Sequence, residues 1–119
     1  MAIAFSSTFA FGQQFAKVSI VNLIAEPKKY HNKSVRVIGA SQIAFEGSEV
    51  CLSKDDLLFQ ISSNCLYLKF DIKTDNLTSF NGKYVLIEGV FDAKDKGHGS
   101  LNSGTIKEVT RYYLWEDRD

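Results

Sequence analysis

A ten-residue pattern occurs twice in this chain, 50 residues apart, and it constrains the fold more than any other feature. Residues 30–39 read YHNKSVRVIG and residues 80–89 read FNGKYVLIEG. Each copy has an aromatic residue, two turn-forming residues, a lysine and then an alternating apolar run that ends in glycine. Two copies of a pattern, 50 residues apart, are too few and too widely separated to indicate a solenoid repeat. We therefore expect two strands that occupy similar places in one barrel, with Gly39 and Gly89 where each strand bends.

Alternation of apolar and polar residues predicts five strands. They cover residues 34–40, 49–53, 64–71, 83–92 and 105–115, and the first of them could continue through Phe45. Apolar residues at helical spacing predict a short helix over residues 19–26 that ends at Pro27. Ser19 is its expected N-cap, although the reciprocal capping position holds Asn22 in place of Glu or Gln. The connection at residues 74–81 has room for one helical turn.

Five strands, a helical connection between the third and the fourth, and two glycine corners resemble the oligonucleotide/oligosaccharide-binding (OB) fold. Three stretches carry a narrower resemblance: residues 23–39 (LIAEPKKYHNKSVRVIG), Phe45-Glu46 and Gly97-His98-Gly99. In these stretches the chain resembles small exported bacterial OB-fold proteins of uncharacterised function. The resemblance rests on structural motifs, so it implies a fold and no active site. We expect an all-β domain with one or two short helices and a five-stranded OB-like barrel, closed or partly open.

The charge composition argues against nucleic acid as the partner. The 119 residues include 14 Lys and Arg against 14 Asp and Glu, so the formal net charge is zero. Proteins that bind nucleic acid usually carry a basic excess, because phosphate contacts supply much of their affinity. The length suits one domain, which we place at residues 13–119. No stretch is long and apolar enough to predict a transmembrane helix.

Residues 1–12 differ from the rest of the chain. Their sequence, MAIAFSSTFAFG, has no charge and consists mostly of small or apolar residues. This pattern is typical of the apolar part of a secretory signal, and it predicts a mature start at Gln13, although no Lys or Arg follows Met1. The alternative is a loose N-terminal arm. We expect a periplasmic or secreted protein, with a cytoplasmic location as the alternative.

Cys51 and Cys65 each lie in a short apolar run, which suggests neighbouring strands. In an oxidising compartment they would form a disulfide around a loop of about 15 residues, which the chain-entropy model values at about 3 kcal/mol. Two buried free thiols are the alternative, and the residues alone do not decide between them. A zinc site is not predicted, because no pair of histidines completes the ligand set.

The polar, glycine-rich loop at residues 94–104 contains the first candidate for a binding residue, His98. Gly97 and Gly99 flank it and allow the backbone to approach a ligand closely, and Lys96 precedes them. In an OB barrel the loop between the last two strands borders the usual binding face. The alternative is a flexible hairpin tip with a solvated histidine.

Two further candidates are Glu46 and Tyr67. The Glu46 carboxylate would face His98 or a basic partner, unless it is an ordinary turn residue. The Tyr67 ring would stack on a base or a sugar, unless it packs against a neighbouring strand. Other aromatic and cationic residues on the predicted strands would extend such a stacking surface: Tyr84, Tyr112, Tyr113, Trp115, Arg36, Lys69, Lys107 and Arg111.

No catalytic constellation is visible in the sequence. His31 and His98 are the two histidines, and no Gly-x-Ser-x-Gly motif occurs. We therefore expect no enzymatic activity, no cofactor and no metal. The function we expect is a non-catalytic exported module that binds an envelope ligand or a partner protein. An immunity protein that neutralises a toxin and a single-stranded nucleic-acid binder are the alternatives, and the sequence leaves the oligomeric state open.

Overall fold

The two copies of the repeated pattern lie side by side, as the antiparallel strands β2 (Ser34–Gln42) and β5 (Tyr84–Asp92). The computed structural model describes residues 14–116. In the register of the two strands, Val37 pairs with Ile87, which holds the same position in the other copy. The repeat is therefore a local two-fold arrangement centred on this pair.

Backbone hydrogen bonds repeat with the same local symmetry. The N–H of Ser41 donates to the carbonyl oxygen of Lys83 at 3.1 Å, and the N–H of Phe91 donates to the carbonyl oxygen of Lys33 at 3.0 Å. The two donors are 50 residues apart, and so are the two acceptors. The turn that precedes each strand thus closes on the end of the other strand, so the two copies of the pattern occupy equivalent places in the barrel.

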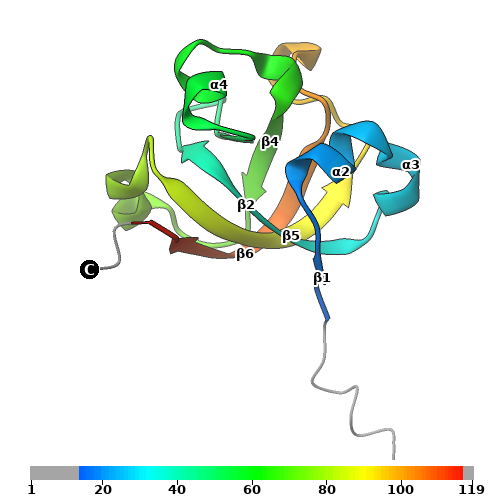
Figure 1. The fold of residues 1–119 in the computed structure, drawn as a ribbon. Coiled ribbons are helices and arrows are strands. Elements are labelled where there is room, and N and C mark those ends of the chain that lie inside the picture. The colour runs from blue at the N-terminus through cyan, green and yellow to red at the C-terminus, as the bar shows by residue number, and fades with distance from the viewer. Residues whose placement is uncertain (1–13, 117–119) are drawn as a thin grey trace, which may run out of the picture.

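Four further strands complete one six-stranded sheet that closes into a barrel (Figure 1). They are β1 (Ala16–Lys17), β3 (Glu49–Cys51), β4 (Cys65–Phe70) and β6 (Thr105–Leu114). Neighbours follow the order β1-β2-β3-β4-β6-β5, and the β2–β5 pairing closes a ring of five strands. β4 and β6 run parallel, and β1 adds a short parallel strand outside the ring. The closed mixed barrel confirms the predicted OB-like fold. β1 was not predicted from the sequence, and the predicted signal segment at residues 1–12 lies outside the described residues.

Short helices fill the connections between strands. They are α2 (Ile20–Ala25), α3 (Pro27–Tyr30), α4 (Lys54–Leu58) and the 3-10 turns η1 (Ser62–Asn64), η2 (Asp75–Phe80) and η3 (His98–Ser100). Asn22 completes the capping box of α2 in place of the usual Glu or Gln. Its side-chain oxygen accepts the Ser19 N–H at 3.0 Å, and its own N–H donates to Ser19 Oγ at 3.3 Å. None of the helices described between residues 14 and 116 is long and apolar enough to span a membrane.

Inward-facing aliphatic side chains fill the barrel. Phe91 is the largest of the fully buried side chains, and α2 adds Ile20 and Leu23 to the same core. Complete burial of a side chain of this kind contributes about 1.5–3 kcal/mol before entropy is counted. The strand positions that face this core include Val35, Val37, Val50, Leu66, Leu68, Val85, Ile87, Ile106 and Val109.

A second, smaller cluster lies on the opposite side of the barrel wall. Cys51 and Cys65 are next to Val50 and Leu66 of the main core, so the alternation of a strand points them outward, where they pack with Leu57 of α4. The two cysteines pair directly across β3 and β4 and form a disulfide. The structure therefore has the bridge and not the two free thiols.

Gly39 and Gly89 lie where neighbouring strands approach too closely for a side chain. A Cβ at Gly39 would be 2.5 Å from the carbonyl oxygen of Cys51, and one at Gly89 would be 2.7 Å from that of Lys107. Gly89 also lies at the register shift between β5 and β6. Contact with the neighbouring strand, as well as any bend of the strand itself, thus requires glycine at both positions.

The predicted continuation of the first strand through Phe45 is wrong, because β2 ends at Gln42. The N–H of Ile43 donates to the side-chain oxygen of Asn81 at 2.8 Å, so a side chain replaces the next strand partner. The chain then leaves the sheet in a turn in which Phe45 is 91% exposed.

Candidate functional site

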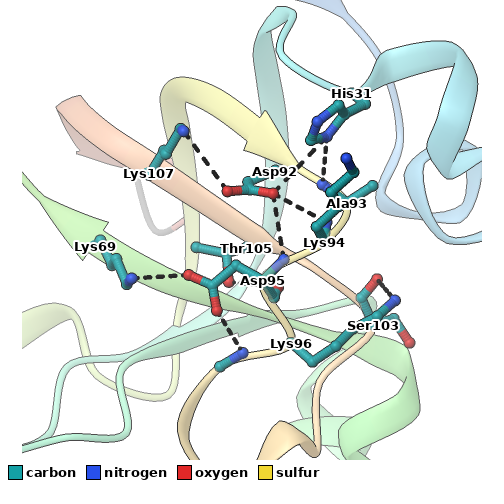
Figure 2. A network of polar contacts seen from close by, with 11 residues as sticks. His31, Lys69, Asp92, Ala93, Lys94, Asp95, Lys96, Ser103, Thr105 and Lys107 are labelled. Carbon is teal, nitrogen blue, oxygen red and sulfur yellow. Dashed lines mark hydrogen bonds and ion pairs between the residues drawn. The ribbon is translucent and has the colours of Figure 1, made fainter.

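The connection from β5 to β6 is held in place by two aspartates at its start, as Figure 2 shows. Asp92 Oδ1 accepts the backbone N–H groups of Lys94 at 2.9 Å and Asp95 at 3.2 Å, and Lys107 Nζ lies 3.6 Å from the other carboxylate oxygen. Burial alone would raise the pKa of Asp92, but the two N–H groups and the lysine outweigh it and lower this pKa. Asp92 is therefore an ionised anchor for the loop that follows it.

Asp95 fixes the next part of the same loop. Its Oδ2 lies 2.8 Å from Lys69 Nζ on β4, and its Oδ1 accepts the N–H of Gly97 at 2.9 Å. Thr105 donates its hydroxyl to the Asp95 carbonyl oxygen at 2.9 Å. The hydrogen bond from Lys69 and the N–H of Gly97 lower the pKa of Asp95, and the same carboxylate raises the pKa of Lys69. These contacts hold the first half of the loop against β4 and β6, while His98 at its tip is exposed to solvent.

His31 anchors the base of this loop by accepting a backbone hydrogen bond. The N–H of Ala93 donates to His31 Nδ1 at 3.0 Å, as the N–H of Ile43 donates to Asn81 Oδ1 in the other copy of the repeat. An accepting Nδ1 assigns the ring proton of the neutral imidazole to Nε2. His31 thus has a structural role that matches that of Asn81.

The far end of the loop is tied to β3 and to the chain before β4. Asn102 donates its side-chain N–H to Glu49 Oε1 at 3.2 Å. Ser103 donates its hydroxyl to the Ser63 carbonyl oxygen at 2.6 Å and its backbone N–H to the Cys65 carbonyl oxygen at 3.1 Å. These bonds fix the loop against two strands that the disulfide already joins.

The fixed loop forms one wall of a cleft of about 210 Å³, which we call the loop cleft. Its lining comes from the β2–β3 turn, from β3 and β4, from the α4–η1 connection and the start of η1, and from the β5–β6 loop. The lining residues are Glu46, Gly47, Glu49, Gln60, Ser62, Tyr67, His98, Leu101 and Asn102. The structure thus brings the predicted candidates Glu46, Tyr67 and His98 together. This position, between the first and last hairpin loops of the barrel, is where OB folds usually bind their ligands.

The other predicted site residues contribute differently. Gly97 packs directly on Tyr67, because a Cβ at Gly97 would lie 2.8 Å from the Tyr67 ring carbon Cγ. Gly99 is in the left-handed region with a φ of 73° but does not line the cleft. Lys96 lines a different hollow beside His31, and its Nζ lies 3.5 Å from the Ser103 carbonyl oxygen.

The loop cleft is acidic, and exposed apolar residues line it or precede its lining residues in the chain. Among its lining residues, Glu46 and Glu49 are acidic and none is Lys or Arg. Leu101 lines the cleft, while Phe45 precedes Glu46 and Phe59 precedes Gln60 in the chain, and each of these three side chains is more than half exposed. Phe59 and Leu101 were not predicted from the sequence, although apolar residues inside polar connections were the available signal.

Side chains that could ligate a metal meet next to the cleft, but two of them are already used. The ligating atoms of Glu49, Cys51 and Cys65 lie within 4.8 Å of one another. The two sulfur atoms are joined in the disulfide, so they cannot act as thiolate ligands. This group therefore does not form a metal centre in the oxidised protein.

The aromatic residues suggested as a stacking surface do not share one face. Tyr112 is buried in the barrel, where its hydroxyl shares a 2.6 Å hydrogen bond with Ser41 and where burial raises the pKa of Tyr112. Tyr113, next along β6, points to the outside of the barrel. The cations suggested with them are in ion pairs: Arg36 and Arg111 with Glu88, Lys69 with Asp95, and Lys107 with Asp92.

Comparison with known proteins gives no relationship that bears on function. No family model matches the chain, and no curated protein matches it significantly. Among solved structures, one match is the crystal structure of a "putative aspartyl-tRNA synthetase" from Leishmania major Friedlin, with 11% identity and a TM-score of 0.48. The match covers 96% of this chain and only 23% of that one. A similarity this distant carries no argument about this chain.

Proposed function

We propose that this chain is a non-catalytic, exported module that binds a partner protein in the loop cleft. The observation that carries the proposal is the cleft itself, which separate connections build on the usual ligand face of an OB barrel. Leu101 lines it, Phe45 and Phe59 each precede a lining residue in the chain, and all three are exposed to solvent. Large apolar side chains of this kind favour association, because a partner that covers them removes their surface from water.

The charge of the cleft selects the partner's chemistry. Glu46 and Glu49 line it without a lysine or arginine among the lining residues, so a segment with both basic and apolar side chains is the complementary ligand. A nucleic-acid backbone would bring phosphates towards two carboxylates. Electrostatics therefore favour a protein partner over a single strand of nucleic acid.

The disulfide supports the exported location. Cys51 and Cys65 are bridged, and such bridges persist mainly in the periplasm, at the cell surface or outside the cell. The apolar segment at residues 1–12 supports the same location, because its composition is typical of a secretory signal.

Affinity capture with matched variants tests the proposal. The full chain, tagged at its C-terminus, is expressed in its own host and recovered from the envelope fraction, and the bound proteins are identified by mass spectrometry. We expect one stoichiometric partner with the parent chain. The double variant Phe45→Ser, Leu101→Ser should reduce its recovery at least about tenfold, because exposed apolar anchors dominate such interfaces.

Val21→Ser is the matched control, since Val21 is half exposed on α2 and does not line the loop cleft. It should retain the partner, and all variants should melt close to the parent temperature. Equal recovery with all three proteins would contradict the proposal, and so would recovery with nucleic acid from the cytosol. A captured toxin or hydrolase that loses its activity when bound would define the module as an inhibitor.

A further inference from the structure

A second hollow lies away from the loop cleft, on the outer wall of the barrel. It has a volume of about 610 Å³, within the range of about 300–1,000 Å³ that is typical of small-molecule sites. We call it the β2–β5 groove. Its lining includes Lys17, Val18, Arg36, Ile38, Leu86 and Trp115, and it shares no lining residue with the loop cleft.

The floor of the groove is an apolar row that crosses three strands. Val37, Ile87 and Tyr112 face the core, so the adjacent positions Ile38, Leu86 and Tyr113 face outward. Ile38 pairs with Leu86, and Leu86 pairs with Tyr113. Ile38 is 41% exposed and Trp115, at the end of the same floor, is 44% exposed. An apolar chain that lay across the strands would cover this row.

Positive charge borders one side of the apolar row. Arg36 pairs with Glu88 at 2.6 Å, and Arg111 pairs with the same carboxylate at 3.3 Å. Glu88 is buried between the two guanidinium groups, so two cations share one anion and one positive charge remains uncompensated. Lys17 adds a second positive charge to the lining of the groove, and no Asp or Glu lines it.

We propose that the β2–β5 groove binds an amphiphilic anion, a molecule with an apolar chain and a carboxylate head, free in solution. The apolar chain lies over Ile38, Leu86 and Trp115, and the head lies beside Lys17 and Arg36. The charge excess at one side and the apolar floor at the other select this class over neutral or cationic amphiphiles. This proposal does not depend on the protein partner proposed for the loop cleft, because the two sites share no lining residue and are tested separately.

The single tryptophan of the chain reports on this site directly. Trp115 is the one Trp in 119 residues and it lines the groove, so a ligand that covers it changes its emission. The oxidised full chain is titrated with decanoate, kept below the concentration at which it forms micelles, and with decyltrimethylammonium, which has the same chain and the opposite charge. We expect a saturable emission change with decanoate at a concentration at least about tenfold lower than with the cation.

Two charge-reversed variants complete the test. Lys17→Glu should weaken decanoate binding about fivefold or more, as expected when an exposed cation beside the head group is replaced by an anion. Lys73→Glu, in the β4–β5 connection and outside the groove, should leave the affinity unchanged. Isothermal titration calorimetry gives a second readout of the same affinities. The proposal is overturned by equal affinity for the anion and the cation, by equal weakening in both variants, or by binding to anionic lipid vesicles without binding to decanoate.

Discussion

His31 and Asn81 hold equivalent positions in the repeat, and each accepts one backbone N–H from the end of the other strand. The turn residue that follows each of them has a positive φ, 66° at Asn32 and 83° at Gly82. Two chemically different side chains thus complete the same turn. A histidine in this position needs no catalytic or ligand-binding explanation, because an amide oxygen serves the same purpose 50 residues later.

This equivalence predicts different outcomes for two substitutions of one residue. His31→Ala leaves the Ala93 N–H without its acceptor and should lower the free energy of unfolding by about 1 kcal/mol. His31→Asn should retain most of the stability, because its side-chain oxygen can accept the same hydrogen bond. Urea denaturation of both variants measures the difference. Equal losses would show that the imidazole ring itself, and not the hydrogen bond, stabilises the turn.

Asp95 gives the fold a pH dependence whose sign follows from its pKa. The Lys69 ammonium and the Gly97 N–H lower the pKa of Asp95 below its ordinary value of 3.8, so the unfolded chain binds a proton more readily than the folded one. The stability from this pair is therefore present above the ordinary pKa and is lost as the pH falls through the lower folded pKa.

We accordingly expect Asp95→Asn to be less stable than the parent at neutral pH. The difference should shrink as the pH falls from about 5 to about 3, because the parent loses the ion pair as its carboxylate takes up a proton. Thermal unfolding across this range is the measurement. A difference that stays constant across the range would contradict the assignment of the Asp95–Lys69 pair as the source of the pH dependence.

At the scale of elements, the sequence predicted those whose pattern is local. All five barrel strands and α2 were found close to their observed bounds, because inward and outward positions alternate along each strand. β1 was not predicted, because its two residues are both exposed and too few to show an alternating apolar pattern. They pair only with the open edge of β2. Phe45 was assigned to a strand because the apolar pattern continues past Gln42, and the sequence does not show that Asn81 ends the pairing there.

Gly39 in β2 and Gly47 in the turn that follows it yield a stability prediction with an internal control. Gly39→Ala places a Cβ 2.5 Å from a backbone oxygen of β3 and should lower the free energy of unfolding by about 2 kcal/mol or more. Gly47→Ala places a Cβ no closer than 3.8 Å to its nearest neighbour and should be neutral. Chemical denaturation compares the two. If both variants had the same free energy of unfolding as the parent, β2 and β3 would be able to move apart at no cost in stability.

At the scale of the whole molecule, the sequence predicted part of the loop cleft. Glu46 was expected to face His98 or a basic partner and Tyr67 was proposed separately, and the barrel brings all three into one cleft because its loops meet at one end. The contact between Glu49 and Asn102 was not predictable, since it depends on how the last loop folds back over β3. The β2–β5 groove was missed for a similar reason, because its charged and apolar rows exist only after three strands pair in register.

Removal of the disulfide should lower the stability of the whole fold. Cys51 and Cys65 are separated by 14 positions, and opening this loop with Cys51→Ser should lower the free energy of unfolding by about 3 kcal/mol in the chain-entropy model. Parent protein purified from an oxidising compartment and unfolded without reductant should react with no thiol reagent. Reaction with two equivalents would show that the bridge does not form there.

The walls of the loop cleft are connected before any partner arrives. The disulfide joins β3 to β4, and Asn102 and Ser103 tie the last loop to both. Binding of the proposed partner would then require no rearrangement of the cleft backbone, and docking of the two surfaces would set the association rate. Variants of the cleft should accordingly bind at similar rates and differ in residence time, so that a tight complex is one that dissociates slowly.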